Sequence, residues 1–318
     1  MLKDIVKLEK KPRRSLTPLE WIVLAYLAVT TLWIVFAYTK MPHPMDLLLN
    51  RVKVLFTIGA TVLVYHLYPS RLTMLFRVGV QMALLAWWYP DTYEMNRVLP
   101  NLDHLFAGYE QSLFGCQPAL LFAKKMPSVL VSELMDLGYA SYYPMMVAVL
   151  LFYFFCRYGE FQRCATILIG SFFAYYLVFD FLPVVGPTFY YHAVGVNQIA
   201  GGIFPSLGDY FNTHTECLPS PGYEQGIFYQ LVETAKNAGE RPTAAFPSSH
   251  VGVSTICLLL AWHSRNRRLT LCLLPLYLLL CLATVYIQAH YAIDALAGLL
   301  SGVLIYALSY FFTRKMKS

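Results

Sequence analysis

Eight long apolar runs constrain this chain more than any other feature of its sequence. An α-helix needs about 20 consecutive, mostly apolar residues to cross the hydrocarbon core of a bilayer. Only 13% of the residues are charged and 58% are hydrophobic, whereas soluble domains carry about 25% charged residues. We therefore predict an all-α fold, a polytopic transmembrane helix bundle, with spans at approximately 19–38, 53–68, 72–89, 132–155, 162–183, 248–264, 269–288 and 291–312.

The basic residues indicate how this bundle is oriented. The formal net charge is +6, but the lysines and arginines gather beside the ends of apolar runs. Such clusters are typical of cytoplasmic segments, and they leave no basic face for nucleic acid. We predict an integral multi-pass membrane protein with both termini cytoplasmic. The clusters are Lys3, Lys7, Lys10, Lys11, Arg13 and Arg14, then Arg265, Arg267 and Arg268, then Arg314, Lys315 and Lys317.

Two segments on the predicted outer side are too long for turns. Residues 90–127 have mixed polarity, and we expect one or two helices there that lie in the membrane interface. Residues 185–246 hold 8 of the 18 glycines together with many aromatic side chains. The aromatic content argues against disorder, so we expect a partly ordered cap on the outer face. Residues 87–89, Trp-Trp-Tyr, are expected to form an interfacial aromatic belt.

Two of the seven cysteines stand apart from the others. Cys116 and Cys217 are alone on the predicted outer side, one in each long segment. Disulfides persist in oxidising compartments, so the sequence leaves open both a Cys116–Cys217 bridge and a pair of free thiols. No Cys/His spacing typical of a zinc site is present, and we expect neither a metal nor a cofactor.

A first polar motif opens the sixth predicted span. Residues 241–250 read Arg-Pro-Thr-Ala-Ala-Phe-Pro-Ser-Ser-His. Ser248 or Ser249 can cap the helix that follows, and the free N–H groups of a helix N-terminus attract anions. Arg241 can add a forked donor for phosphoryl oxygens. The residue types in this motif therefore favour phosphate binding next to His250.

A second polar motif opens the eighth predicted span, and topology returns it to the depth of the first. Residues 290–294 read His-Tyr-Ala-Ile-Asp. His290 and Asp294 are four residues apart and share a helix face. The carboxylate can accept the Nδ1 hydrogen, which leaves Nε2 free as a nucleophile. Gly298 and Gly302 continue this face, and small residues at this spacing allow close helix packing.

Together these motifs resemble a known family. Residues 247–250, Pro-Ser-Ser-His, and the pair His290 and Asp294 are similar to the two C-terminal motifs of the type-2 phosphatidic acid phosphatase superfamily. The resemblance covers about 240–312. It implies that His290 attacks phosphorus to form a phospho-histidine, that Asp294 orients His290, and that His250 protonates the leaving group. A weaker resemblance to the inositol phosphorylceramide synthase branch is carried by residues 181–187, 190–191, 283–286 and 290–291.

Departures from the phosphatase pattern favour that branch. Phosphatase members carry Lys-x6-Arg-Pro well upstream and an arginine six residues before the nucleophilic histidine. Here Arg241 lies close to the first motif, Lys236 has the wrong spacing, and residue 284 is threonine. A phosphodiester carries one negative charge where a monoester carries nearly two, so losing an arginine favours a diester, unless Lys236 or another basic group substitutes in space. The expected substrate-binding residues are Lys236, Arg241, Ser248, Ser249 and Tyr291.

The sequence thus predicts a membrane lipid phosphotransferase. It would move a phospho-headgroup from a phospholipid donor to a lipid alcohol, without metal, at the outer (periplasmic or lumenal) face. A lipid phosphate phosphatase that uses water as acceptor, and a non-enzymatic lipid transporter or binder, are the alternatives. The expected regions are a cytoplasmic basic N-terminus (1–18), N-terminal spans with an interfacial segment (19–127), a catalytic helix bundle (128–312, with the outer loop 185–246) and a cytoplasmic tail (313–318).

Overall fold

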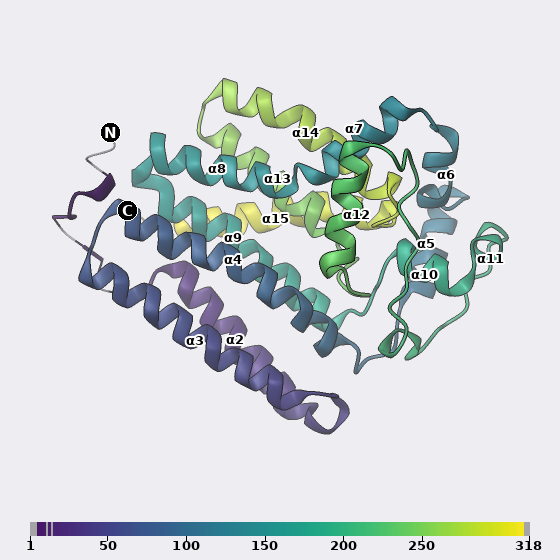
Figure 1. Cartoon of the computed structure of the whole chain (residues 1–318), viewed down its shortest axis with the longest axis horizontal. Coiled ribbons are helices and arrows are strands. Elements are labelled where there is room, and N and C mark those ends of the chain that lie inside the picture. The colour runs from purple at the N-terminus through teal and green to yellow at the C-terminus, as the bar shows by residue number, and fades with distance from the viewer. Residues whose placement is uncertain (1–4, 11, 14, 315–318) are drawn as a thin grey trace.

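Helices account for the regular structure of this protein, as the apolar runs predict. The computed structural model describes residues 5–10, 12–13 and 15–314. Within these residues there is no strand, only an isolated antiparallel bridge between Leu8 and Ser70. The N-terminal helices are α2 (Pro18–Phe36), the short η1 (Tyr38–Lys40), α3 (Pro44–Leu67) and α4 (Arg71–Asn96), as Figure 1 shows.

The remaining helices alternate between the bundle and one of its ends. Short helices follow the N-terminal group: α5 (Asp103–Phe114) and α6 (Pro118–Lys125). The chain then enters the bundle through α7 (Val129–Ala140), α8 (Tyr142–Cys156) and α9 (Tyr158–Phe181). The predicted cap contains α10 (Pro187–Val194), α11 (Val196–Ala200), η2 (Tyr210–Asn212) and α12 (Ile227–Gly239). The last three helices are α13 (Ser249–His263), α14 (Arg267–Tyr286) and α15 (Ala292–Thr313).

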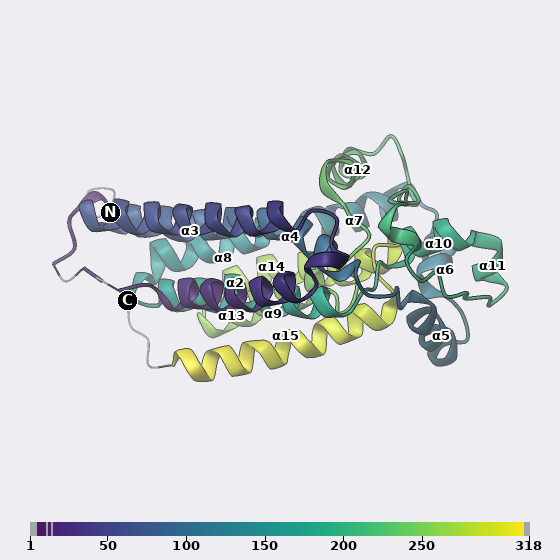
Figure 2. The same ribbon diagram turned by 90° about the horizontal axis from the view of Figure 1, so that it is seen from below.

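The long helices run side by side, and the short ones gather at one end. Figure 2 shows that α2 begins and α15 ends at the same end of the bundle, whereas α5, α6, α10, α11 and α12 lie at the other. A buried cluster that includes Val184, Tyr190 and Tyr291 holds α5, α6, α10 and α11 against the bundle, and Val232 of α12 belongs to a separate cluster with Tyr286 of α14. The predicted partly ordered cap and the helices expected within 90–127 are therefore present.

The predicted count of eight spans is not confirmed. Six helices are long and apolar enough to cross a membrane, and the pair α7 and α8, bent by 47°, would be a seventh. The sixth predicted span corresponds to α13, which has only 15 residues. At 1.5 Å per residue such a helix is shorter than the roughly 30 Å hydrocarbon core. Because most of its side chains are buried against neighbouring helices, α13 is a central helix of the bundle.

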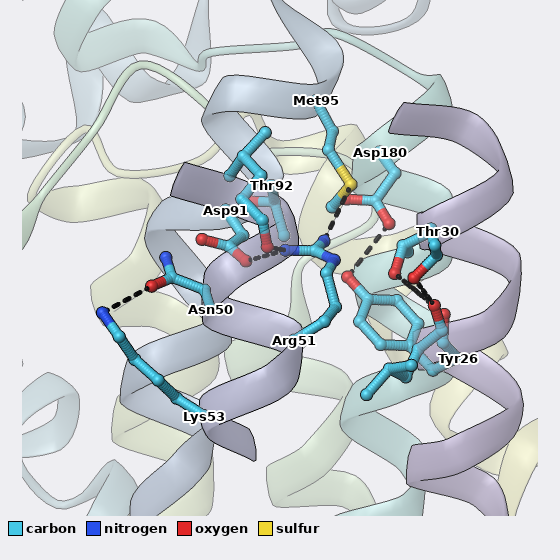
Figure 3. Close-up of polar contacts among 12 residues, drawn as sticks. Tyr26, Thr30, Asn50, Arg51, Lys53, Asp91, Thr92, Met95 and Asp180 are labelled. Atoms are coloured by element: carbon cyan, nitrogen blue, oxygen red, sulfur yellow. Dashed lines mark hydrogen bonds and ion pairs between the residues drawn. The ribbon is translucent and has the colours of Figure 1, made fainter. Parts of the chain in front are cut away.

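A buried ion pair and a buried hydrogen bond join the N-terminal helices to one another and to α9, and these contacts explain where the sequence predictions were wrong. Arg51 of α3 donates to Asp91 of α4 over 2.6 Å, and Tyr26 of α2 donates to Asp180 of α9 over 3.0 Å (Figure 3). A buried charge is tolerated when it is paired, so α3 starts earlier and α4 ends later than the apolar runs predicted. Trp88 is fully buried beside Tyr26, so its predicted place in an interfacial belt is wrong.

Candidate active site

The structure brings His250, His290 and Asp294 together at the end of the bundle that carries the cap. His250 is in the first turn of α13, His290 precedes α15, and Asp294 is in the first turn of α15. Nε2 of His290 lies 3.5 Å from Nδ1 of His250. The backbone N–H of Ser248 donates to the carbonyl of Asp294 over 3.0 Å, which joins the starts of the two helices. Two motifs that are 40 residues apart therefore form one site.

The tautomer of His290 is set by a backbone carbonyl. Nδ1 of His290 lies 2.8 Å from the carbonyl oxygen of Ala245. A carbonyl can only accept, so in neutral His290 the hydrogen is on Nδ1 and the lone pair is on Nε2. Asp294, which the sequence predicted as this partner, is 3.7 Å from Nδ1 and accepts instead from the N–H of Tyr291 over 2.9 Å. His290 precedes α15, so the two residues do not share the helix face that the sequence predicted, and the segment between α12 and α13, which contains Ala245, supplies the closer acceptor.

His290 is neutral near pH 7, as a nitrogen nucleophile must be. Burial lowers the pKa of His290 to about 4, while the hydrogen bond to Ala245 and the nearby carboxylate of Glu240 act in the opposite direction. His290 is only 4% exposed. Its Nε2 lone pair is therefore available across the physiological pH range without prior deprotonation.

His250 is held by aromatic side chains on the other side of the site. Its ring lies 4.7 Å, centroid to centroid, from Tyr139 of α7, and the two planes are nearly parallel at 21°. Tyr142 of α8 lies 4.4 Å away at 37°. The bend between α7 and α8 places both rings beside His250. Because the hydrogen of neutral His290 is on Nδ1, the proton shared across the 3.5 Å contact belongs to His250.

Glycines let α13 and α15 approach closely enough for the histidines to meet. A Cβ atom at Gly298 would clash with the carbonyl oxygen of Ser248, and one at Gly302 would clash with the backbone of Gly252. The predicted small-residue face of α15 is therefore packed against α13. This contact controls the separation of His250 and His290, since each histidine lies at the start of one of the two helices.

Gly298→Ala is expected to destabilise the protein and to slow its turnover. The added methyl group must push α15 away from the backbone of α13, and overpacking of this kind costs about 1–3 kcal/mol. Thermal unfolding of the purified protein measures the effect. The matched control is Gly79→Ala in α4, where nothing lies within 4 Å of the added Cβ. Equal melting temperatures for the two variants would contradict the close packing.

Two buried carboxylates of α5 contact the site, and neither was predicted from the sequence. Glu110 accepts from the backbone N–H of Ile293 over 3.1 Å, and so satisfies one of the free N–H groups at the start of α15. Asp103 accepts from the hydroxyl of Tyr291 over 3.0 Å. The available signal was two carboxylates seven residues apart on an otherwise amphipathic segment, because that spacing places both on one helix face.

The pH dependence of stability should reveal the buried state of Glu110. Burial raises the pKa of Glu110 from 4.5 to about 7, and the N–H groups of Ile293 and Ala292 oppose this shift. The folded state therefore holds a proton that the unfolded state releases. The resulting stabilisation is present below pH 4.5 and is lost as the pH rises through 7, by up to roughly 3 kcal/mol.

We expect the melting temperature of the wild type, relative to Glu110→Gln, to fall between pH 5 and pH 8. Glutamine does not titrate, so the difference between the two proteins isolates this one group. Glu224→Gln, at an exposed carboxylate of the cap, is the matched control. A difference that stays constant with pH would show that Glu110 does not titrate in this range.

Two of the predicted substrate-binding residues, Arg241 and Lys236, make no hydrogen bond to the histidine pair. Arg241 is exposed and makes no hydrogen bond or ion pair with either histidine. Lys236 is engaged within the cap, where it pairs with Glu233 at 3.3 Å and donates to the Leu218 carbonyl and the Ser220 hydroxyl, each over 3.1 Å. In this structure its ammonium group therefore stabilises the cap.

The three other predicted substrate-binding residues differ in how exposed their side chains are. They are Ser248, Ser249 and Tyr291. Ser248 is fully buried, and its hydroxyl caps α13 by accepting from the N–H of Val251 over 3.4 Å. Ser249 is partly exposed at the first position of α13. Tyr291 is fully buried, and its hydroxyl is bonded to Asp103. In this structure the hydroxyl of Tyr291 is therefore engaged with Asp103.

The sequence also raised two further questions, a possible disulfide and a possible metal site. Cys116 and Cys217 are both free thiols, so the bridge considered from the sequence is not formed in this structure. Among residues 5–10, 12–13 and 15–314, no group of three or more His, Cys, Asp and Glu side chains is arranged to hold a metal ion.

Comparison with protein families agrees with this site. The long apolar helices of the bundle indicate an integral multi-pass membrane protein. A model of the PAP2 superfamily matches residues 104–308, more than half of the chain, and the protein belongs to that superfamily. The match begins within α5, so it includes Glu110 as well as both histidine motifs. Searches of curated proteins and of solved structures gave no match.

Proposed function

We propose that this protein is a membrane phosphotransferase that moves a phospho-headgroup from a phospholipid to a lipid alcohol. The observation that carries the proposal is the geometry of His290. Its Nδ1 hydrogen is held by Ala245, and its Nε2 lone pair faces the site 3.5 Å from His250. Membership of the PAP2 superfamily supports phosphoryl chemistry on lipids.

In the first step, Nε2 of His290 attacks phosphorus, and the bond from phosphorus to the diacylglycerol oxygen breaks. His250, which enters this step as the imidazolium, gives one proton to that oxygen and becomes neutral. The ring of His290, which keeps its Nδ1 hydrogen, becomes a positively charged phospho-imidazolium. The Asp294 carboxylate at 3.7 Å from Nδ1 stabilises this charge. Asp294 thus acts on the intermediate through charge, and Ala245 acts on the ground state through the hydrogen bond.

In the second step, His250 takes the proton from the acceptor hydroxyl as that oxygen attacks phosphorus. The bond between Nε2 and phosphorus breaks, and His290 returns to its neutral tautomer. Loose phosphoryl transition states depend on positioning and charge stabilisation. The partly exposed Ser249 and the N-terminus of α13 supply N–H donors for the phosphoryl oxygens.

A diester substrate suits the charges around the histidines better than a monoester does. Among the described residues, no lysine or arginine side chain hydrogen-bonds to His250 or His290. Thr284 stands where phosphatase members have an arginine, and its fully buried hydroxyl donates to the Cys281 carbonyl. With so little positive charge, a singly charged phosphodiester is the better fit, which supports the inositol phosphorylceramide synthase-like branch with a sphingolipid-type acceptor.

The site is proposed to lie at the outer membrane surface, with both termini cytoplasmic. The helices α2 and α15 place the described chain ends at the end of the bundle opposite the cap (Figure 2). Arg265 lies in the connection between α13 and α14, and Arg267 and Arg268 begin α14, whereas His250 lies at the opposite end of α13. Their positive charge supports a cytoplasmic assignment for that end.

The experiment that tests this function follows three products at once. Purified protein is incubated with a panel of phospholipids, with and without a long-chain lipid alcohol, and mass spectrometry scores diacylglycerol, free phosphate and new phospholipid. A transferase releases diacylglycerol in step with new phospholipid and requires the alcohol. Free phosphate from phosphatidic acid, independent of the alcohol, would establish the phosphatase alternative.

A further inference from the structure

Asp103, at the start of α5, is a fully buried carboxylate that accepts hydrogen bonds from three separate segments. One oxygen accepts from the N–H of Val185 over 2.7 Å and from the Asn101 amide over 2.7 Å. The other accepts from the N–H of Gly186 over 2.9 Å and from the Tyr291 hydroxyl over 3.0 Å. An ionised carboxylate offers about four acceptor positions and no donor, so these four donors satisfy it completely.

The first set of contacts leads to His290 through the backbone. Next to the residues bound by Asp103, the carbonyl of Val184 accepts from the N–H of Ala245 over 3.0 Å. The carbonyl of the same Ala245 receives the Nδ1 hydrogen of His290. Gly186 passes so close to His290 that a Cβ atom there would lie 2.8 Å from the carbonyl oxygen of Ala289. Asp103 therefore holds the 184–186 loop, and this loop in turn holds Ala245, whose carbonyl is the acceptor for His290.

The second contact reaches His290 from its other neighbour in the chain. Tyr291 follows His290 directly, is fully buried, and packs edge-on against Tyr191 at 6.1 Å. Its hydroxyl has Asp103 as its partner, and its backbone N–H donates to Asp294. One carboxylate thus constrains both the acceptor of the His290 ring and the residue after His290.

We propose that Asp103 is a positioning residue of the phosphoryl-transfer site, acting through the 184–186 loop and Tyr291 to hold His290 in its Nδ1–H tautomer with Nε2 facing His250. The proposal rests on the proposed role of His290 as nucleophile. Asparagine in place of Asp103 would turn an N–H group toward backbone N–H donors. The loop and Tyr291 must then shift, and a displacement of about 1 Å at a reacting atom costs up to roughly 100-fold in rate.

The first test is kinetic. Asp103→Asn is expected to lower kcat roughly 10- to 100-fold with little change in KM, because the substrate does not touch Asp103. Tyr291→Phe removes one of the four contacts and keeps the ring, so it should produce a smaller loss of the same kind. The double variant should be no slower than Asp103→Asn alone, since both changes act along the same route. Asp209→Asn, at an exposed carboxylate of the cap, is the matched control.

The second test does not depend on turnover. Nitrogen NMR of protein labelled at its 8 histidines, with the His290 signal assigned from His290→Ala, reports which ring nitrogen carries the hydrogen. The wild type should show the Nδ1–H tautomer, and Asp103→Asn should show a mixture. If the wild type turns over no lipid, the proposed function fails while this measurement still decides the inference. An unchanged tautomer together with unchanged kcat in Asp103→Asn would overturn it, and Tyr291→Phe gives the same two readouts if Asp103→Asn does not fold.

Discussion

A His290→Ala variant is expected to lose all detectable lipid turnover and to form no phospho-histidine. Without the Nε2 lone pair there is no covalent route, and the residual site offers only positioning and N–H donors. Purified wild type mixed with donor phospholipid and quenched in alkali should yield a phosphorylated peptide that contains residue 290. The variant should yield none, while its melting temperature stays close to that of the wild type.

His192→Ala is the matched control for the loss of a histidine. His192 is an exposed residue of α10, so its removal should leave both turnover and peptide labelling unchanged. Two results would contradict the assignment of His290. One is turnover by purified His290→Ala at the wild-type rate, and the other is phosphate found on a different residue of the wild type.

The loss in His250→Ala is expected to depend on the leaving group. General acid catalysis contributes roughly 10²–10⁴ in rate when a poor leaving group must be protonated, as diacylglycerol must. A nitrophenyl phosphodiester releases nitrophenolate, which leaves without being protonated. Its reaction with His290 should therefore be nearly as fast in His250→Ala as in the wild type. The measurement is the ratio of the two first-step rates, in His250→Ala against wild type, by rapid quenching.

This dependence separates a proton donor from a residue that merely supports the fold. His250 packs between Tyr139 and Tyr142, so alanine could also loosen the site. His250→Gln, which keeps much of the side-chain volume and a neutral amide, controls for packing. Equal losses for both substrates in both variants would show that His250 has a structural role.

The membrane helices could be predicted because their signal is local. An apolar run long enough for a bilayer contains its own evidence, and each predicted run corresponds to a helix or a bent pair of helices. The ends were less predictable where charge is buried. Arg51 and Asp91 read as polar interruptions in the sequence, yet they pair at 2.6 Å inside the bundle. Trp88 was misplaced for the same reason, since Arg51 and Tyr26 enclose its ring.

The sequence by itself determined the class of fold and the two histidine motifs, because composition and short spacing carry both. His290 and Asp294 are only four residues apart, so they lie close together even though His290 precedes α15 and the two do not share a helix turn. Only the tertiary structure decided that Ala245 holds Nδ1 of His290, that Lys236 is engaged in the cap, and that Asp103 supports the loop beside the site. Asp103 and Tyr291 are 188 residues apart in the chain. A hydrogen bond at that separation depends on how helices pack, and no local pattern encodes its geometry.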